Sequence, residues 1–188
     1  MDGVLQVLYL DFDGVLHPDA AYFSFKRGIE LRAPGHTLFE NIYILEQMLA
    51  PHPEVRIVLS TSWVYAKDFK FAKERLSPVL QKRVIGATFH RRHHDLYHFR
   101  TMSRGQQILG DIQRRQPGAW LSIDDHCEDW PEQAGFVVQC DGQLGLQCAD
   151  TRRCFADALS IVFGHGQLRQ SRGKLNWRGD LDQMRRDA

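Results

Sequence analysis

The chain has 188 residues, a formal net charge of +1, and 43% hydrophobic and 25% charged residues. This length suits one domain with a full hydrophobic core, and the composition is that of an ordinary globular protein. The near-neutral charge argues against a protein coated by nucleic acid or lying on a membrane surface, although local patches can still bind either. No apolar run approaches the roughly 20 residues of a membrane span, and no signal-type segment precedes the first strand. We therefore expect a cytoplasmic protein without a membrane partner.

The first predicted element is a short apolar strand that ends in two carboxylates, Leu8-Tyr-Leu-Asp11-Phe-Asp13-Gly-Val-Leu16. Side chains at i and i+2 of an extended chain share a face, so Asp11 and Asp13 start out pointing the same way. Ligands of open α/β sheets bind beyond the carboxyl ends of strands, and a divalent cation keeps two adjacent carboxylates charged. An EF-hand loop would need its glycine at the sixth position, whereas Gly14 is fourth. A capping turn explains one carboxylate but not two.

The next two predicted elements are a helix and a second strand. Thr37-Leu-Phe-Glu40 has the spacing of a capping box, which predicts that a helix begins there. Apolar residues then repeat at helical spacing and predict one buried face: Leu38, Ile42, Leu45 and Leu49. Residues 55–59 predict a buried strand that closes on Ser60 and Thr61. Hydroxyls at a strand end are either ligand-binding groups or helix N-caps.

Two further elements continue the alternation. Residues 63–76 predict one amphipathic helix with a basic face, and Pro78 stops it. Residues 83–88, Arg-Val-Ile-Gly-Ala-Thr, predict a third short strand. Strands that alternate with helices are typical of a parallel α/β sheet.

Residues 90–100 have the most unusual composition of the chain, His-Arg-Arg-His-His-Asp-Leu-Tyr-His-Phe-Arg. On a helix, His90, His94 and His98 would share a face and could hold zinc. We favour a solvated loop that helps to attract phosphate. Its interleaved arginine and aromatic residues also allow weak contact with a nucleic-acid backbone and stacking on a base.

A second acidic cluster follows the fourth predicted strand. Ser103-Arg-Gly-Gln106 has capping-box spacing and predicts the helix before this strand. Residues 119–123 predict the strand, and Asp124-Asp125-His-Cys-Glu-Asp129 follows directly. Carboxylates at two strand ends supply oxygen ligands of the kind that Mg²⁺ requires, with water and substrate phosphate as the others. The sequence therefore predicts a magnesium site.

The end of the chain predicts a fifth strand over residues 135–139 and a helix over residues 152–163. We expect one domain over residues 1–165 and a loosely docked polar tail over residues 166–188. The cysteines show no CxxC spacing, so we expect free thiols rather than disulfides or a zinc site. They are Cys127, Cys140, Cys148 and Cys154.

The motif Asp11-Phe-Asp13-Gly-Val-Leu at the end of a strand resembles the first motif of the haloacid dehalogenase (HAD) superfamily. The resemblance implies that Asp11 is a nucleophile that forms an aspartyl-phosphate. It implies that Asp13 protonates the leaving oxygen and then activates the hydrolytic water. An Asp at the second position points to phosphate-ester hydrolysis, because the dehalogenase and phosphonate-cleaving branches carry other residues there.

Three further matches follow in the order of the superfamily. The strand that ends at Ser60 resembles the second motif, whose hydroxyl binds a phosphoryl oxygen, with Thr61 as the alternative. Arg104 matches the basic residue near a helix start that neutralises the aspartate and phosphate charges, with Lys82 as the alternative. The pair after the fourth strand matches the fourth motif in its Asp-Asp form. The implied metal site consists of Asp11, Asp13, Asp124 and Asp125.

The resemblance covers roughly residues 8–163 and implies a three-layer, doubly wound, mostly parallel α/β sheet without a large cap domain. Residues 17–34 are available for the hairpin flap that this superfamily places after the nucleophile. We expect the aromatic residues of this segment to pack under the flap rather than gate the site: Tyr22, Phe23 and Phe25. Leu59-Ser-Thr-Ser-Trp63 and Ile123-Asp-Asp125 also resemble HAD domains associated with RNA-repair proteins.

We therefore expect a Mg²⁺-dependent phosphomonoester hydrolase. An uncapped site suits large substrates such as phosphoproteins and nucleic-acid ends, as well as small phosphate esters. One alternative is a HAD-fold module that binds phosphorylated nucleic acid or protein without turnover, and another is a phosphotransferase that passes the phosphoryl group to an alcohol. The intact Asp-x-Asp pair favours turnover, because binding alone does not need the second carboxylate.

Overall fold

The structure, a computed structural model, describes residues 4–127, 130 and 137–164. The expected polar tail, Asp129 and the first two residues of the fifth expected strand lie outside the described residues. No helix among the described residues has the length and apolar character that a membrane crossing requires.

A five-stranded sheet forms the centre of the molecule, with every neighbouring pair of strands parallel. Its order is β5 (Val84–Ala87), β4 (Arg56–Leu59), β1 (Gln6–Leu10), β6 (Ala119–Asp124) and β7 (Val137–Gln139). The chain adds β4 and β5 on one side of β1 and then crosses to add β6 and β7 on the other. This reversal places a topological switch point between β1 and β6, where ligands of α/β sheets bind.

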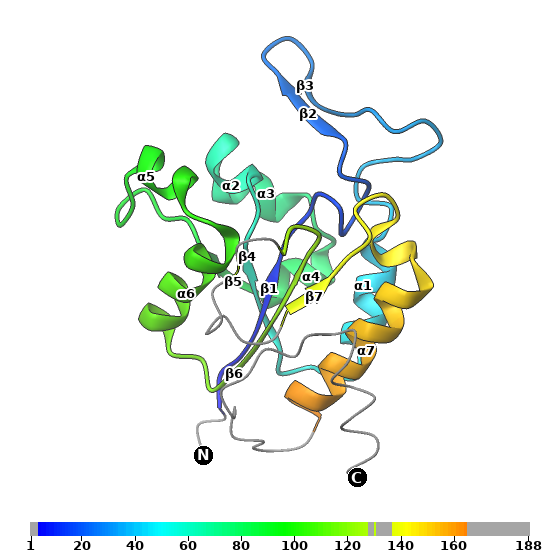
Figure 1. Cartoon of the computed structure of the whole chain (residues 1–188), viewed down its shortest axis with the longest axis vertical. Helices are drawn as coiled ribbons and strands as arrows, with labels where there is room; N and C mark the ends of the chain where they lie inside the picture. Colours follow the sequence, from blue (N-terminus) through cyan, green and yellow to red (C-terminus); the bar gives the residue numbers. More distant parts are fainter. Residues whose placement is uncertain (1–3, 128–129, 131–136, 165–188) are drawn as a thin grey trace.

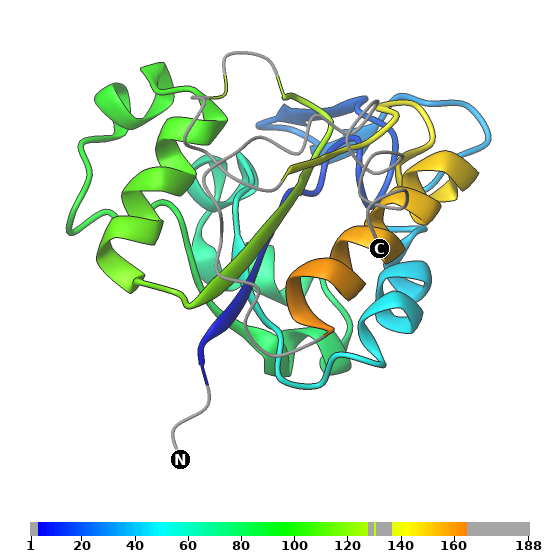
Figure 2. The same ribbon diagram turned by 60° about the horizontal axis from the view of Figure 1, so that its bottom comes forward.

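Helices cover both faces of the sheet and produce three layers (Figure 2). On one face, Leu8 and Leu10 of β1 belong to the core that contains residues of α1 (Ile42–Leu49) and α7 (Ala149–Phe163). On the other face, Val7 and Tyr9 pack with Ile108 of α6 (Arg104–Arg115). β1 is apolar along its length because both of its faces are buried. The predicted doubly wound α/β fold is confirmed.

A separate antiparallel hairpin, β2 (Ala21–Ser24) and β3 (Gly28–Leu31), stands at the carboxyl edge of the sheet (Figure 1). It takes the place of the expected flap, and the described residues contain no cap domain. The prediction that its aromatic residues pack beneath it is wrong, because Tyr22, Phe23 and Phe25 are 51%, 42% and 99% exposed. Cations cover two of these rings: the Arg32 guanidinium lies 4.5 Å from the Tyr22 centroid and the Lys67 ammonium 4.1 Å from that of Phe23.

The first predicted helix starts later than the capping-box pattern indicates. α1 begins at Ile42, because Phe39 has a φ of 64° and interrupts the helical path. Half of the expected box forms, since the Glu40 carboxylate accepts a hydrogen bond of 2.9 Å from the Thr37 N–H. The Phe39 ring packs edge-on against Phe12 and Trp63, with centroids 5.2 and 5.0 Å away, and this contact offsets the backbone strain.

The single helix predicted over residues 63–76 is two short helices, α2 (Trp63–Ala66) and α3 (Phe69–Glu74). The first ends before Lys67, whose backbone is not helical, and Asp68 caps the second, because its carboxylate accepts a 2.7 Å hydrogen bond from the Phe71 N–H. Pro78 begins a helix that was not predicted, α4 (Pro78–Arg83), behind an N-capping Ser77.

The second half of the chain follows its predicted order more closely. α6 begins with the predicted capping box, in which the side chains of Ser103 and Gln106 accept from each other's backbone N–H. A short helix, α5 (Leu96–Thr101), lies before it. A 3₁₀ turn, η2 (Gly145–Gln147), precedes α7, which begins three residues before the predicted Arg152.

Candidate active site

Asp11 lies directly after β1 at the switch point and is 3% exposed. Its Oδ1 accepts a 2.7 Å hydrogen bond from the Phe12 N–H, and its Oδ2 accepts one of 2.8 Å from Arg104 Nη2. A carboxylate oxygen can accept two hydrogen bonds, so each oxygen keeps a lone pair for another partner. Burial, against the opposing charge of Arg104, raises the pKa of Asp11 well above its usual value, and the carboxylates of Asp124 and Asp13 raise it further.

Arg104 is the first residue of α6 and connects two strand ends. Besides its contact with Asp11, its Nε lies 2.9 Å from Oδ2 of Asp124, which ends β6. Burial alone lowers the pKa of Arg104, but these two carboxylates outweigh it and raise the pKa above the usual value. Gln107, one turn further along α6, accepts from Arg104 Nη1 at 3.4 Å and helps to fix the guanidinium. The alternative, Lys82, is exposed at the end of α4.

Three carboxylates converge on one point: ligand oxygens of Asp11, Asp124 and Asp125 all lie within 4.8 Å of one another. Burial raises the pKa of Asp124 to about 6, with Arg104 opposing. Burial also raises the pKa of Asp125, opposed by its 2.9 Å contact with His126 Nδ1. Carboxylate oxygens are the ligands that Mg²⁺ prefers, and a bound divalent cation would relieve the repulsion between these carboxylates.

One atom of this cluster supports the fit to a cation. The contact between Asp124 Oδ2 and Arg104 Nε is close but is not aligned as a hydrogen bond, so Oδ2 is buried without a hydrogen-bond partner among the described residues. A buried charged oxygen in this condition has room in its coordination for an ion. The residues present therefore fit Mg²⁺. A second, more exposed group of Asp19, Asp125 and His126 lies beside it.

Gly14 makes space for the carboxylate cluster. Its φ is +67°, and a Cβ built on it would lie 2.3 Å from Cγ of Asp125. Any other residue at this position would be strained and would displace Asp125. The glycine after the Asp-x-Asp pair thus serves the second acidic cluster, a role that the sequence pattern does not indicate.

Asp13 lies apart from the carboxylate cluster. Its carboxylate, to which the sequence analysis assigned both acid-base chemistry and metal binding, belongs to neither of the two groups above among the described residues. The indole Nε1 of Trp63 donates to its Oδ1 and Oδ2 at 3.2 and 3.0 Å, and Nε2 of the fully buried His17 lies 3.0 Å from Oδ1. Because the Phe39 N–H donates to His17 Nδ1, the neutral ring carries its proton on Nε2 and donates it to Asp13.

Sequence reasoning missed Trp63 and His17 as members of the site. The position of Trp63, three residues beyond Ser60 at a strand end, was the available signal. Its contact with Asp13 spans 50 residues of sequence, which no local periodicity reveals.

Ser60 and Thr61 differ in whether their hydroxyls have a hydrogen-bond partner among the described residues. Ser60 follows β4, is 0% exposed, and its Oγ has no hydrogen-bond partner among the described residues. Thr61 Oγ1 accepts a long hydrogen bond of 3.4 Å from the Trp63 N–H and so already has a partner. An unpartnered buried hydroxyl costs free energy unless a ligand satisfies it, which favours Ser60 as the phosphate contact.

The segment of residues 90–100 forms a turn and most of α5. Its arginines and Tyr97 are exposed, and the His94 ring stacks on Phe89 with centroids 6.0 Å apart. His90, His94 and His98 were the zinc candidates. In the described part of the chain, none of them belongs to a group of side chains close enough together to hold a metal ion. The four cysteines are free, as expected.

Comparison with known proteins agrees with this geometry. Residues 7–151 match the model of one family, described as the HAD domain in Swiss Army Knife RNA repair proteins. No curated protein and no solved structure matches the chain. The matched region includes the carboxyl ends of β1, β4 and β6 together with Arg104. The chain therefore belongs to the family of HAD domains found in Swiss Army Knife RNA repair proteins.

Proposed function

We propose that this protein is a Mg²⁺-dependent phosphomonoester hydrolase that acts on phosphorylated nucleic-acid ends through an aspartyl-phosphate. The observation that carries the proposal is the arrangement around Asp11. Arg104 and a carboxylate cluster lie on one side of it, and Asp13, held by two ring N–H groups, lies two residues away. The RNA-repair setting in the family description supports the choice of a nucleic-acid end as substrate.

In the first step, an oxygen of Asp11 attacks the phosphorus in line with the ester bond. The bond from phosphorus to the leaving oxygen breaks, and Asp13 gives its proton to that oxygen. In the second step, Asp13 takes a proton from water, and the water oxygen attacks the same phosphorus. The bond to Asp11 then breaks, which releases inorganic phosphate and regenerates the carboxylate.

The other residues stabilise charge during both steps. Arg104 carries a fixed positive charge 2.8 Å from Asp11 and orients the nucleophile. The Ser60 hydroxyl donates to an oxygen of the transferring phosphoryl group. Asp11, Asp124 and Asp125 would hold Mg²⁺, which supplies Lewis-acid stabilisation of the phosphate charge when bound.

The test is hydrolysis of a panel of phosphate esters by wild type and Asp11→Asn, with Mg²⁺ and with chelator. The panel contains an aryl phosphate, nucleoside monophosphates, and RNA oligonucleotides with a 5′ or a 3′ phosphate. Asp150→Asn is the matched control, because this aspartate is 74% exposed on α7. We expect phosphate release that needs both Asp11 and metal and survives in the control. A wild-type protein that releases no phosphate from any member would refute the proposal.

A binding module without turnover is the second candidate, and the exposed basic and aromatic segment of residues 90–100 favours it. Exposed arginines neutralise backbone phosphates, and Tyr97, 81% exposed, offers a ring for stacking. This candidate predicts salt-dependent binding of an RNA end that is retained in Asp11→Asn without phosphate release. Product analysis with an added alcohol distinguishes a phosphotransferase, because the phosphoryl group would then appear on the alcohol.

A further inference from the structure

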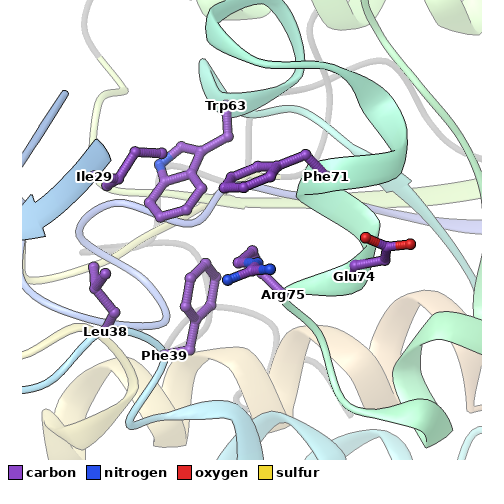
Figure 3. Close-up of a pocket in the computed structure, with 7 residues that line it drawn as sticks. All are labelled: Ile29, Leu38, Phe39, Trp63, Phe71, Glu74 and Arg75. Carbon is purple, nitrogen blue, oxygen red and sulfur yellow. The ribbon is translucent and has the colours of Figure 1, made fainter. Parts of the chain in front are cut away.

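A pocket of about 530 Å³ lies between the hairpin and the helices that follow β4 (Figure 3). β3 and the loop before α1 provide one wall, and α2 and α3 provide the other. The lining includes one carboxylate and one guanidinium beside the apolar and aromatic side chains, and its residues are Ile29, Leu38, Phe39, Trp63, Phe71, Glu74 and Arg75. This volume is within the range of pockets that bind small molecules, roughly 300–1,000 Å³.

Three aromatic rings line the pocket, those of Phe39, Trp63 and Phe71. The rings of Phe39 and Trp63 meet edge to face with centroids 5.0 Å apart, and Phe71 lies nearly parallel to Trp63 at 6.3 Å and 25°. Phe71 is only partly buried, so it can present its ring to a ligand. Aromatic surfaces of this kind suit a flat, conjugated ligand better than a flexible aliphatic one.

Two cations lie beside Phe71. The Arg75 guanidinium is 4.6 Å from the centroid of Phe71, and both residues line the pocket (Figure 3). The Lys67 ammonium is 5.7 Å from Phe71 and 4.1 Å from the exposed Phe23 of the hairpin. Rings on which a base can stack, with cations beside them for the backbone phosphates, are the combination that single-stranded nucleic acids bind.

Trp63 connects the pocket to the candidate active site. The same indole that lines the pocket donates its N–H to Asp13, the residue that would protonate the leaving oxygen. Asp13 and the pocket therefore lie against the same side chain. We propose that the pocket binds the nucleobase of the nucleoside that leaves when Asp11 takes the phosphate. This inference rests on the proposed function, since it names the part of the substrate next to the reacting bond.

The experiment compares substrates that have or lack a base. We would measure kcat/KM for adenosine 5′-monophosphate, adenosine 3′-monophosphate and ribose 5-phosphate in wild type, Phe71→Leu and Arg75→Gln. Leucine keeps apolar volume at position 71 and removes only the aromatic face. Phe69→Leu is the matched control, because Phe69 opens the same helix, is 36% exposed and does not line the pocket.

We expect the wild type to prefer at least one adenosine monophosphate over ribose 5-phosphate. Phe71→Leu should reduce kcat/KM for that nucleotide roughly 5- to 150-fold, the range for loss of one base-stacking contact. Its kcat/KM for ribose 5-phosphate should change far less, and Phe69→Leu should keep the preference. An oligonucleotide that ends in the preferred phosphate then shows whether a free nucleotide or a polynucleotide end binds better.

Calorimetric binding of adenosine monophosphate separates this inference from the proposed function. A protein that hydrolyses no phosphate ester but binds the nucleotide through Phe71 would refute the proposed function and support the assignment of the pocket as a nucleobase site. Hydrolysis without preference for a base, together with binding that does not depend on Phe71, would overturn the assignment. A Phe71-dependent preference for a phosphotyrosine peptide over both nucleotides would overturn it too, because the pocket would then belong to a peptide side chain.

Discussion

Replacing Trp63 by phenylalanine tests whether the indole N–H holds Asp13 in its working position. The change removes a donor that is shared between Oδ1 at 3.2 Å and Oδ2 at 3.0 Å, and it keeps an aromatic ring between Phe12 and Phe39. Asp13 would then keep only its contact with His17 among those described above.

The magnitude follows from this geometry. A hydrogen bond to a charged group contributes about 1.5–3 kcal/mol. One N–H divided between two oxygens, on a carboxylate whose side chain is 19% exposed, belongs at the low end. A loss of about 1.5 kcal/mol in the transition state corresponds to roughly a 10-fold decrease in kcat. KM should change less, because Asp13 acts in proton transfer and not in holding the phosphate.

The assay is steady-state hydrolysis of ribose 5-phosphate by Trp63→Phe, Asp13→Asn and the double variant. Trp120→Phe is the control, because Trp120 is 4% exposed in the core on the other face of the sheet. If Trp63 acts through Asp13, its substitution has no further effect in the Asp13→Asn background. A folded Trp63→Phe protein whose kcat equals that of the control, or whose effect adds fully to that of Asp13→Asn, would refute the reasoning.

Three other predictions concern one glycine of the site and two side chains that affect the stability of the fold. Gly14→Ala should destabilise the protein by about 1–3 kcal/mol and raise the Mg²⁺ concentration needed for activity, because the new Cβ would meet Asp125. Gly35→Ala is the control, because Gly35 also has a positive φ, +84°, but has open space where a Cβ would lie. This control should lose only the stability that the backbone strain costs. Asp111→Asn should lower the free energy of unfolding in urea by about 1–3 kcal/mol, because this buried carboxylate accepts from Tyr9, Arg114 and Arg115. An unchanged free energy of unfolding would contradict this prediction. Burial, with the Arg83 charge, lowers the pKa of His52, so the unfolded chain binds the proton first and stability falls as pH drops below about 6.5. His52→Gln should flatten that fall between urea melts at pH 7 and pH 5, and an equal fall in wild type and variant would contradict the prediction.

The parts of the fold that the sequence predicted are those with strong local signals. β1 and β4 are short apolar runs that are buried on both faces, and the capping box of Ser103 and Gln106 forms as expected. Carboxylates after two parallel strands had to meet, because the carboxyl ends of neighbouring strands share one edge of the sheet. The paired register of Leu10 with Ile123 places Asp11 and Asp124 at the same level.

The parts that could not be predicted depend on contacts between segments far apart in sequence. The helix expected from Thr37 begins only at Ile42, because Phe39 adopts a positive φ and packs against Trp63, a residue 24 positions away. The aromatic residues of the hairpin were expected to be buried. Instead, the rings of Tyr22 and Phe23 contact neighbouring cations rather than apolar side chains. The spacing of apolar residues indicates neither outcome, because each depends on how a loop packs against an element distant in sequence.

Arg104 shows how topology converts a weak motif into a defined site. A single arginine near a helix start has little meaning in sequence alone. β5 lies at one edge of the sheet and β6 on the far side of β1, and α6, the second of the two helices that connect them, begins beside the carboxyl ends of β1 and β6. Its first residue then faces the switch point, where the planar guanidinium reaches Asp11 with Nη2 and Asp124 with Nε. A lysine ammonium is a point charge without that fork, so the arginine fixes the spacing of the two carboxylates as well as neutralising them.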